Sequence, residues 1–200
     1  MIQKTVFAVA LILISMSVSA QYKTLEIGDV APDKDYKMEN VDGEWLSYNS
    51  VKGETGTLVI FSCNTCPFVV AWEDRYPQVA KIANDNNVGL MLVNSNHLKR
   101  DGDDSKKAMK AHAEAKSYKW PYLVDNESKL ANAYGAMTTP HVFLFDKNDK
   151  LVFIGAIDDN YKDASKVSAF YLKDAMTALA QGSEIAQKVT RATGCSIKRP

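Results

Sequence analysis

Two cysteines separated by two residues carry the clearest chemistry in this sequence. Cys63 and Cys66 follow the apolar run at residues 58–61, and Pro67 comes directly after them. Two thiols at this spacing can cycle between a dithiol and a disulfide, because one thiolate attacks a substrate disulfide and its neighbour then resolves the mixed disulfide. The spacing therefore indicates thiol–disulfide redox chemistry, with Cys63 as the attacking thiolate and Cys66 as the resolving thiol.

The elements on either side of the pair favour a reactive thiolate. The apolar run at 57–61 predicts a strand buried on both faces, and an amphipathic pattern from Pro67 to about residue 86 predicts a helix. The strand fixes Cys63 at its carboxyl end, and the amino end of the helix offers unpaired N–H groups and a positive dipole. The pKa of a thiol in such a place falls from about 8.5 to roughly 3.5–7.5.

Two other uses of the pair compete with redox chemistry. A structural zinc site needs two further ligands, but only Cys195 and three scattered histidines remain, none at ligand spacing. An inert disulfide between Cys63 and Cys66 closes a very small loop and constrains the unfolded chain little. The redox interpretation is preferred, and a non-catalytic domain with a structural disulfide stays open as an alternative. No metal or cofactor is expected.

The first twenty residues have the pattern of a secretory signal peptide. Lys4 precedes an apolar stretch at 6–14, and the small residues Val18-Ser19-Ala20 form a cleavage site. The apolar stretch is shorter than the roughly 20 residues that a membrane span needs. We therefore expect cleavage after Ala20 and a periplasmic or secreted protein that is not held in a membrane.

Composition limits the remaining classes. The 200 residues contain 24 Lys plus Arg and 24 Asp plus Glu, so the formal net charge is zero and no basic field attracts nucleic acid. The mature chain at 21–200 is long enough for one domain with a core, and a polar tail is expected from about residue 182. In a compartment that permits disulfides, the expected partners are protein or small-molecule disulfides and a thiol reductant that recycles the dithiol.

Strand and helix patterns alternate along the rest of the chain. The pair Asp42-Gly43 predicts a small hairpin in an N-terminal extension, and Pro77 is expected to interrupt the helix after the dithiol. Further strands are expected at 88–93, 122–124, 142–145 and 151–157, and further helices from Asp103 or Asp104 to about 116, at 128–134 and at 164–180. This order predicts an α/β fold, in which helices cover both faces of a mixed central sheet and the dithiol lies at one strand end.

Four residues outside the dithiol are candidates for accessory roles. Pro140 precedes the strand at 142–145, at a position where a sheet tolerates proline. His141 either tunes the Cys63 thiolate by its charge or packs within the strand. Glu73 either relays a proton or is an ordinary exposed helix carboxylate. Cys195, the third cysteine, is either a resolving thiol or a spare one in the tail.

Several separated motifs together resemble the thioredoxin superfamily and, within it, the peroxiredoxin-like redoxin subgroup of the alkyl hydroperoxide reductase/thiol-specific antioxidant branch. These motifs are Ile27-Gly28-Asp29-Val30-Ala31-Pro32, Asp42-Gly43, Cys63-Asn64-Thr65-Cys66-Pro67-Phe68-Val69, Val93-Asn94-Ser95-Asn96, Tyr134-Gly135, Thr139-Pro140 and Gly194-Cys195-Ser196-Ile197-Lys198. The resemblance covers nearly all of the mature chain. It implies a thioredoxin-like fold with an N-terminal β extension.

The resemblance also implies roles for individual residues. In the superfamily a cis Thr-Pro faces the dithiol, so Thr139-Pro140 is expected to present backbone groups to an extended substrate chain. Peroxiredoxins carry Pro-x-x-x-Thr/Ser-x-x-Cys, but Val59 and Cys63 stand at the proline and hydroxyl positions when Cys66 is the final cysteine. The expected activity is therefore that of a thiol-disulfide oxidoreductase. A peroxiredoxin-like thiol peroxidase, whose sulfenate is resolved by the neighbouring cysteine or by Cys195, is the alternative.

Overall fold

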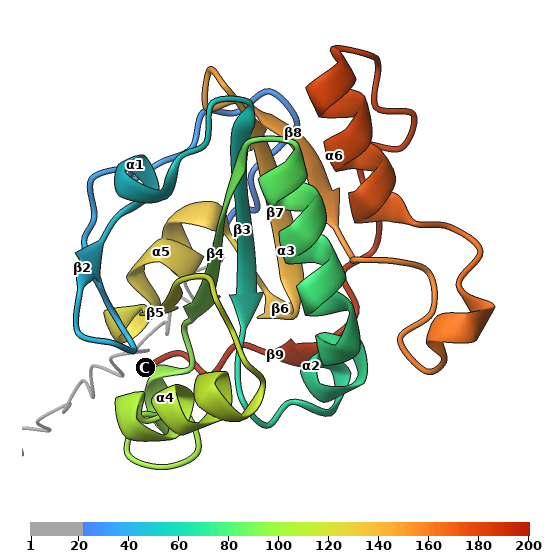
Figure 1. Ribbon diagram of the computed structural model, residues 1–200. Coiled ribbons are helices and arrows are strands. Elements are labelled where there is room, and N and C mark those ends of the chain that lie inside the picture. Colours follow the sequence, from blue (N-terminus) through green and yellow to red (C-terminus); the bar gives the residue numbers. More distant parts are fainter. Residues whose placement is uncertain (1–21) are drawn as a thin grey trace, which may run out of the picture.

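The computed structural model describes residues 22–200 as a mixed central sheet with helices on both faces (Figure 1). The sheet has seven strands in the order β2-β1-β5-β4-β3-β7-β8. The predicted α/β class and layer arrangement are confirmed. The expected signal peptide at 1–20 and its cleavage site lie outside the described residues. Within residues 22–200, the helices are all too short or too polar to span a bilayer.

Strand β3 is an interior strand of the sheet, and all seven of its residues are buried, as the apolar run predicts. It pairs in parallel with β4 and antiparallel with β7, so the sheet is mixed. A separate two-stranded sheet joins β6 to β9 near the end of β3. The strands are β1 Met38–Asn40, β2 Trp45–Leu46, β3 Gly56–Ser62, β4 Val88–Asn94, β5 Tyr122–Val124, β6 Thr138–Thr139, β7 His141–Asp146, β8 Leu151–Gly155 and β9 Cys195–Ser196.

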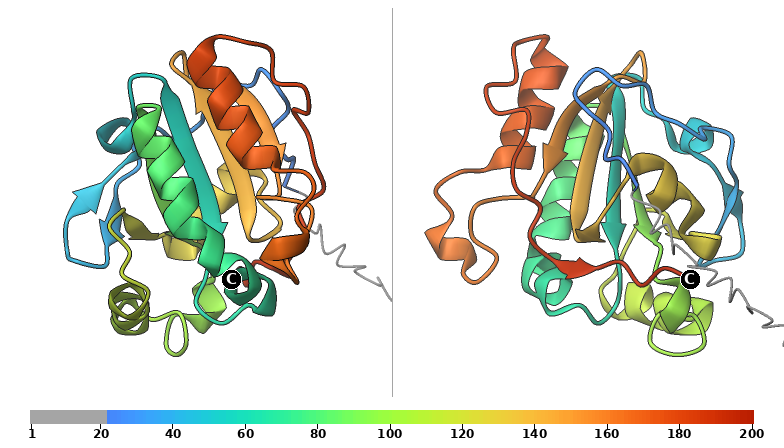
Figure 2. Two further views of the ribbon diagram at one scale, coloured as in Figure 1. Left: turned by 45° about the vertical axis from the view of Figure 1, so that its right-hand side comes forward. Right: turned by 180° about the vertical axis from the view of Figure 1, so that it is seen from behind.

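The helices divide between the two faces of the sheet, as the three views show (Figure 2). One buried cluster contains side chains of α2, α3, α4 and α6, and the other contains side chains of α1 and α5. The helices are α1 Tyr48–Val51, α2 Pro67–Trp72, α3 Tyr76–Asp85, α4 Lys106–Ala115, α5 Lys129–Tyr134 and α6 Tyr171–Gln181, and the short 3-10 turns are η1 Glu73–Arg75, η2 His97–Lys99, η3 Asn126–Ser128 and η4 Ala164–Lys166.

Most of the predicted elements are present with bounds close to those expected. The Asp42-Gly43 hairpin is β1–β2, and the hairpin expected at 142–157 is β7–β8. The helix expected after the dithiol is split into α2, η1 and α3. The last of these, α3, begins at Tyr76-Pro77. Proline lacks the backbone donor that an uninterrupted helix would require there, which explains the break.

Three element predictions are wrong. The cap of α4 is Ser105, whose hydroxyl accepts from the Ala108 amide at 3.2 Å, and not Asp103 or Asp104. The helix expected at 164–180 begins only at Tyr171, because backbone groups before it bond elsewhere: Asp159 N–H donates to Ala169 O. The tail from about 182 is not a loose polar end, since it contains β9 and the buried Ile197.

Candidate active site

The two cysteines lie between the carboxyl end of β3 and the start of α2. Ser62 is the last residue of β3, and Cys66 is the N-cap residue of α2. The peptide bond between Thr139 and Pro140 is cis, and this segment faces both sulfurs. Thr139 Oγ1 lies 3.3 Å from Cys63 Sγ, and Thr139 O accepts from Cys66 Sγ at 3.1 Å. The structure therefore brings together all four residues that were predicted as catalytic or substrate-binding.

Both sulfurs belong to free, largely buried cysteines. Cys63 is 2% exposed and Cys66 is 6% exposed. The wall of the site is apolar, because both residues belong to the larger buried cluster, together with Trp72 and Tyr76. Of the two cysteines, Cys66 is the more exposed residue.

The two thiols shift each other's ionisation in opposite directions. A hydrogen bond from the Cys63 thiol lowers the pKa of Cys66 to about 4, against the opposing effect of burial. The same hydrogen bond, together with burial, raises the pKa of Cys63 well above its ordinary value. A thiol that donates to a neighbouring thiolate favours the charged form of its neighbour and holds its own proton.

The contacts around Cys66 favour this sulfur as the thiolate. Besides Cys63, the Cys195 thiol and the backbone amide of Val69 lower the pKa of Cys66. The backbone amide of Cys195 acts in the same direction as these donors. The carbonyl oxygen of Thr139 favours the neutral form of Cys66 instead, because the protonated thiol donates a hydrogen bond to it. The contacts favour the charge on Cys66, whereas the sequence predicted it on Cys63.

The loop between the cysteines is fixed by a buried carboxylate. Asp104 is 1% exposed and accepts from the Asn64 backbone amide at 2.9 Å. It also accepts from the side-chain amides of Asn94, at 2.8 Å, and Asn96, at 2.9 Å. Tyr122 Oη donates to Asn64 Oδ1 at 2.9 Å. The sequence points to the two asparagines only within the motif Val93-Asn94-Ser95-Asn96, and the role of Asp104 is missed because the pattern there is also that of a helix cap.

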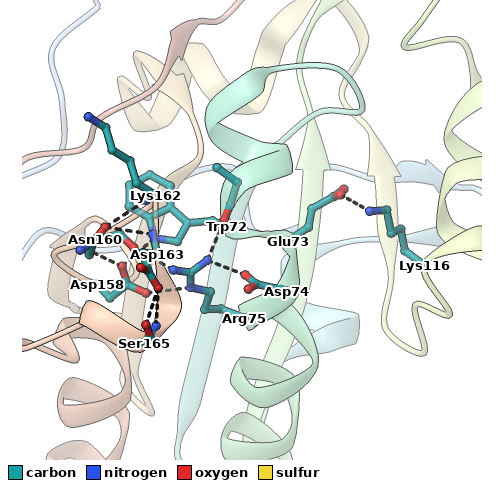
Figure 3. A network of polar contacts seen from close by, with 11 residues as sticks. Trp72, Glu73, Asp74, Arg75, Lys116, Asp158, Asn160, Lys162, Asp163 and Ser165 are labelled. Atoms are coloured by element: carbon teal, nitrogen blue, oxygen red, sulfur yellow. Dashed lines mark hydrogen bonds and ion pairs between the residues drawn. The ribbon is translucent and has the colours of Figure 1, made fainter.

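A second polar network holds the helix that follows the dithiol (Figure 3). Trp72 Nε1 donates to Asp158 Oδ1 at 2.8 Å, and Arg75 Nε lies 3.3 Å from Asp158 Oδ2. Glu73 points the other way and forms an ion pair with Lys116 Nζ at 2.8 Å. Glu73 is 5% exposed, so the prediction of an exposed helix carboxylate is wrong. It joins η1 to the residue that caps α4.

His141 does not supply a positive charge to the dithiol. Its side chain is buried, and burial lowers its pKa to about 4, so the imidazole is neutral at neutral pH. Its Nδ1 accepts from the Met137 amide at 3.3 Å, and its ring packs against Phe143 with centroids 4.6 Å apart. His141 is thus packed within β7, as the second of the two predicted alternatives has it.

Cys195 lies at the dithiol, a position that no pattern in the sequence predicted. It is in β9, where it is the direct partner of Thr139 in the register of the small sheet. Its half-buried side chain packs against the cluster that contains Cys63 and Cys66. The paired residues are 56 positions apart in the sequence (195 − 139), and no local pattern in a single sequence reports such a pairing.

Comparison with family models gives a match over residues 27–154 to the AhpC/TSA family. This chain belongs to the AhpC/TSA family. The match begins in the N-terminal extension, includes the dithiol and the cis-proline, and ends at β8. No curated protein matches the chain in sequence.

Solved structures support the same fold. An uncharacterized conserved protein from Geobacillus kaustophilus is 32% identical with a TM-score of 0.81, over 88% of this chain and 93% of that one. Peroxidoxin BcpB from Mycobacterium tuberculosis is 12% identical with a TM-score of 0.60, over 79% and 97% of the two chains. The thioredoxin domain of a thiol-disulfide oxidoreductase from Bacteroides vulgatus is 24% identical with a TM-score of 0.52, over 66% and 90%. The thioredoxin-like fold is thereby confirmed.

Proposed function

We propose that this protein is a thiol-disulfide oxidoreductase that acts through Cys63 and Cys66. The observation that carries the proposal is the meeting of two free thiols at Thr139, which lies 3.3 Å from Cys63 Sγ through its hydroxyl and accepts from Cys66 Sγ at 3.1 Å through its carbonyl. The lowered pKa of Cys66 supports one thiolate beside one thiol at neutral pH, which is the state that thiol–disulfide exchange starts from. The redox character of the family and the fold shared with solved thiol-disulfide oxidoreductases support the proposal.

The contacts suggest a sequence of two exchange steps. The Cys66 thiolate attacks one sulfur of a substrate disulfide, a mixed disulfide forms, and the other substrate sulfur leaves as a thiolate that takes up a proton. Cys66 then no longer carries the charge that held the proton on Cys63. Cys63 ionises and attacks Cys66 Sγ, so the internal disulfide forms and the second substrate sulfur leaves. The substrate gains two electrons and two protons, and the dithiol loses them.

Thr139-Pro140 and the location of the protein are further parts of the proposal. Thr139 holds both sulfurs through its hydroxyl and its carbonyl, so its role in the site is to position the dithiol and the chain opposite to it. We place the protein in the cell envelope, on the signal-peptide pattern at 1–20. Its partners there are disulfides that it reduces, or thiols that it oxidises, and a thiol that restores its working state.

Reduction of glutathione disulfide and of insulin by the full chain tests the proposal. We expect Cys66→Ser to abolish turnover, because no thiolate remains to attack. We expect the double variant Cys63→Ser/Cys195→Ser to accumulate a mixed disulfide on Cys66, since no thiol remains to resolve it. Ser196→Ala, which changes an exposed neighbour and removes no thiol, serves as the control with unchanged turnover. Full activity of both cysteine variants would refute the proposal.

Reduction of peroxide is the second candidate activity. The small exposed fraction of Cys66 and its lowered pKa favour a small oxidant, and the fold is shared with a peroxidoxin. In this reaction the Cys66 thiolate attacks one oxygen of hydrogen peroxide, the O–O bond breaks, and the other oxygen leaves as hydroxide, so that Cys66 becomes a sulfenic acid. Cys63 then attacks Cys66 Sγ, the S–O bond breaks, and the departing hydroxide takes up the proton of Cys63 to give water and the disulfide. Stopped-flow oxidation by hydrogen peroxide separates the two activities. A rate no faster than that of free cysteine would exclude the peroxidase.

A further inference from the structure

The edge of β6 beside the dithiol is occupied by this chain's own C-terminal segment. Strand β9 pairs antiparallel with β6, with Thr138 opposite Ser196 and Thr139 opposite Cys195. Figure 1 shows β9 next to β6 and close to the start of α2. This is the position at which the sequence predicted an extended substrate chain. The chain that Thr139 meets in the structure is residues 194–196.

The segment is docked in one fixed register. A Cβ atom on Gly194 would lie 2.3 Å from Thr139 O, so only glycine allows so close an approach there. Beyond β9, Ile197 is buried and its N–H donates to Met137 O at 3.1 Å. The Lys198 amide donates to Asn96 Oδ1 at 2.9 Å. These contacts hold Cys195 at one place along the edge.

That place is beside Cys66. Cys66 Sγ lies 3.1 Å from the carbonyl oxygen of Thr139, and Thr139 is the residue directly paired with Cys195. Cys195 packs against the buried cluster of the dithiol from outside and is itself half-buried. The three cysteines thus form one group that runs from the interior to the surface, in the order Cys63, Cys66, Cys195.

We propose that Cys195 is a third redox cysteine, which takes the disulfide from Cys63–Cys66 and presents it at the surface to a dithiol reductant. The proposal rests on the proposed dithiol function. In the exchange, the Cys195 thiolate attacks Cys66 Sγ, the bond between Cys63 and Cys66 breaks, and a bond between Cys66 and Cys195 forms. Cys63 leaves as a thiolate and takes up the proton that Cys195 released. The number of disulfides does not change in this step.

Regeneration then occurs at the surface. One thiolate of the external dithiol attacks Cys195 Sγ, and Cys66 leaves as the thiolate. The second thiol of the reductant displaces Cys195, so the reductant becomes a disulfide and the protein is fully reduced. The half-buried Cys195 is the more accessible target, whereas Cys63 is 2% exposed. Transfer of the disulfide to Cys195, which we call the relay, therefore lets a bulky reductant react with a sulfur that it can reach.

The charges in the group are consistent with this order. Burial and the adjacent Cys66 raise the pKa of Cys195 to about 11, which keeps Cys195 protonated while Cys66 is a thiolate. Once Cys66 is in a disulfide, its negative charge is absent and that part of the effect on Cys195 disappears. Oxidation of the dithiol therefore makes Cys195 the better nucleophile, at the stage at which the relay uses it.

Disulfide mapping of full-chain variants that each lack one cysteine tests whether Cys195 lies beside Cys66. After oxidation of Cys63→Ser with glutathione disulfide, we expect an internal disulfide between Cys66 and Cys195. After the same treatment of Cys66→Ser, we expect internal linkage of Cys63 to Cys195 to be at least about tenfold slower, because Cys195 lies beside Cys66. No internal disulfide in Cys63→Ser, or equal rates in the two variants, would overturn the proposal.

Recycling kinetics test the function. We expect Cys195→Ser to slow recycling by a protein dithiol such as thioredoxin at least about tenfold more than it slows the first reduction of glutathione disulfide. We expect Gly194→Val, which displaces β9 without removing a thiol, to lose the Cys66–Cys195 linkage when combined with Cys63→Ser. Thermal melting of each variant confirms that it folds. If the wild type reduces glutathione disulfide and Cys195→Ser is recycled at the same rate, the role of Cys195 is refuted and the dithiol function stands. If the wild type itself does not reduce glutathione disulfide, the dithiol function is refuted.

Discussion

Removal of the Cys63 donor is the perturbation that most directly probes the ionisation of the dithiol. Cys63→Ala deletes the thiol whose hydrogen bond lowers the pKa of Cys66 to about 4. A hydrogen bond to a charged group contributes about 1.5–3 kcal/mol, and one pKa unit corresponds to about 1.4 kcal/mol. We therefore expect the pKa of Cys66 to rise by about 1–2 units in this variant.

The assay is the pH dependence of alkylation of Cys66 by iodoacetamide, with each labelled cysteine identified by peptide mapping. In the wild type, the rate at Cys66 is expected to change little between about pH 6 and 8, because the thiolate is already fully formed. The matched control is Cys63→Ser, whose hydroxyl can still donate and which should shift the profile less. An unchanged profile in Cys63→Ala, or a wild-type pKa of Cys66 near the ordinary 8.5, would refute the assignment.

The same ionisation links stability to pH. The pKa of Cys66 is lower in the folded protein than in the unfolded chain, so the folded thiolate contributes stability that is complete above the unfolded pKa of about 8.5. That contribution falls as pH decreases toward the folded pKa of about 4. We expect the difference in unfolding free energy between the reduced wild type and Cys66→Ala to diminish over this range. A constant difference would contradict a lowered pKa.

Three further predictions concern the residues around the dithiol. Asp104→Asn places an amide where the Asn64 N–H and two asparagine side-chain amides need an acceptor. We expect urea unfolding to show a loss of about 1–3 kcal/mol in unfolding free energy, and hydrogen exchange to show a faster-exchanging Asn64 amide. Unchanged exchange would show that Asp104 does not fix the loop. Trp72→Phe removes the donor to buried Asp158 and should lower the unfolding free energy by about 1–3 kcal/mol, whereas a neutral result would mean that this network does not hold the helix. The pKa of His141 is about 4 in the folded protein and about 6.5 in the unfolded chain. The contribution of neutral His141 to the unfolding free energy is therefore complete above about pH 6.5 and decreases by up to about 3 kcal/mol as pH falls toward 4. We expect His141→Phe to lose this part of the acid destabilisation. Parallel pH profiles for the variant and the wild type would contradict this.

The sequence was sufficient for the parts of the fold that local patterns encode. The apolar run before the dithiol is the fully buried β3, and the Asp-Gly turn is the β1–β2 hairpin. Pro77 marks the restart of the helix because proline removes a backbone donor wherever it occurs. Each of these features depends on residues that are neighbours along the chain.

The parts that the sequence did not predict depend on contacts between distant residues. Asp104 has the position of a helix cap, but its carboxylate fixes a loop forty residues earlier in the chain. The charge of His141 is determined by its burial, and burial follows from the packed sheet. The identity of the thiolate depends on donors from three separate segments, one of which is β9. No spacing rule for Cys-x-x-Cys contains this information.

The redox potential of the Cys63–Cys66 pair, measured by equilibration with glutathione buffers in wild type and Cys195→Ser, tests the central claim most directly. A redox-active dithiol of this fold is expected to have a potential between about −270 and −120 mV and to form the internal disulfide reversibly. A potential below about −300 mV would identify a structural disulfide, and the enzymatic account would then be wrong.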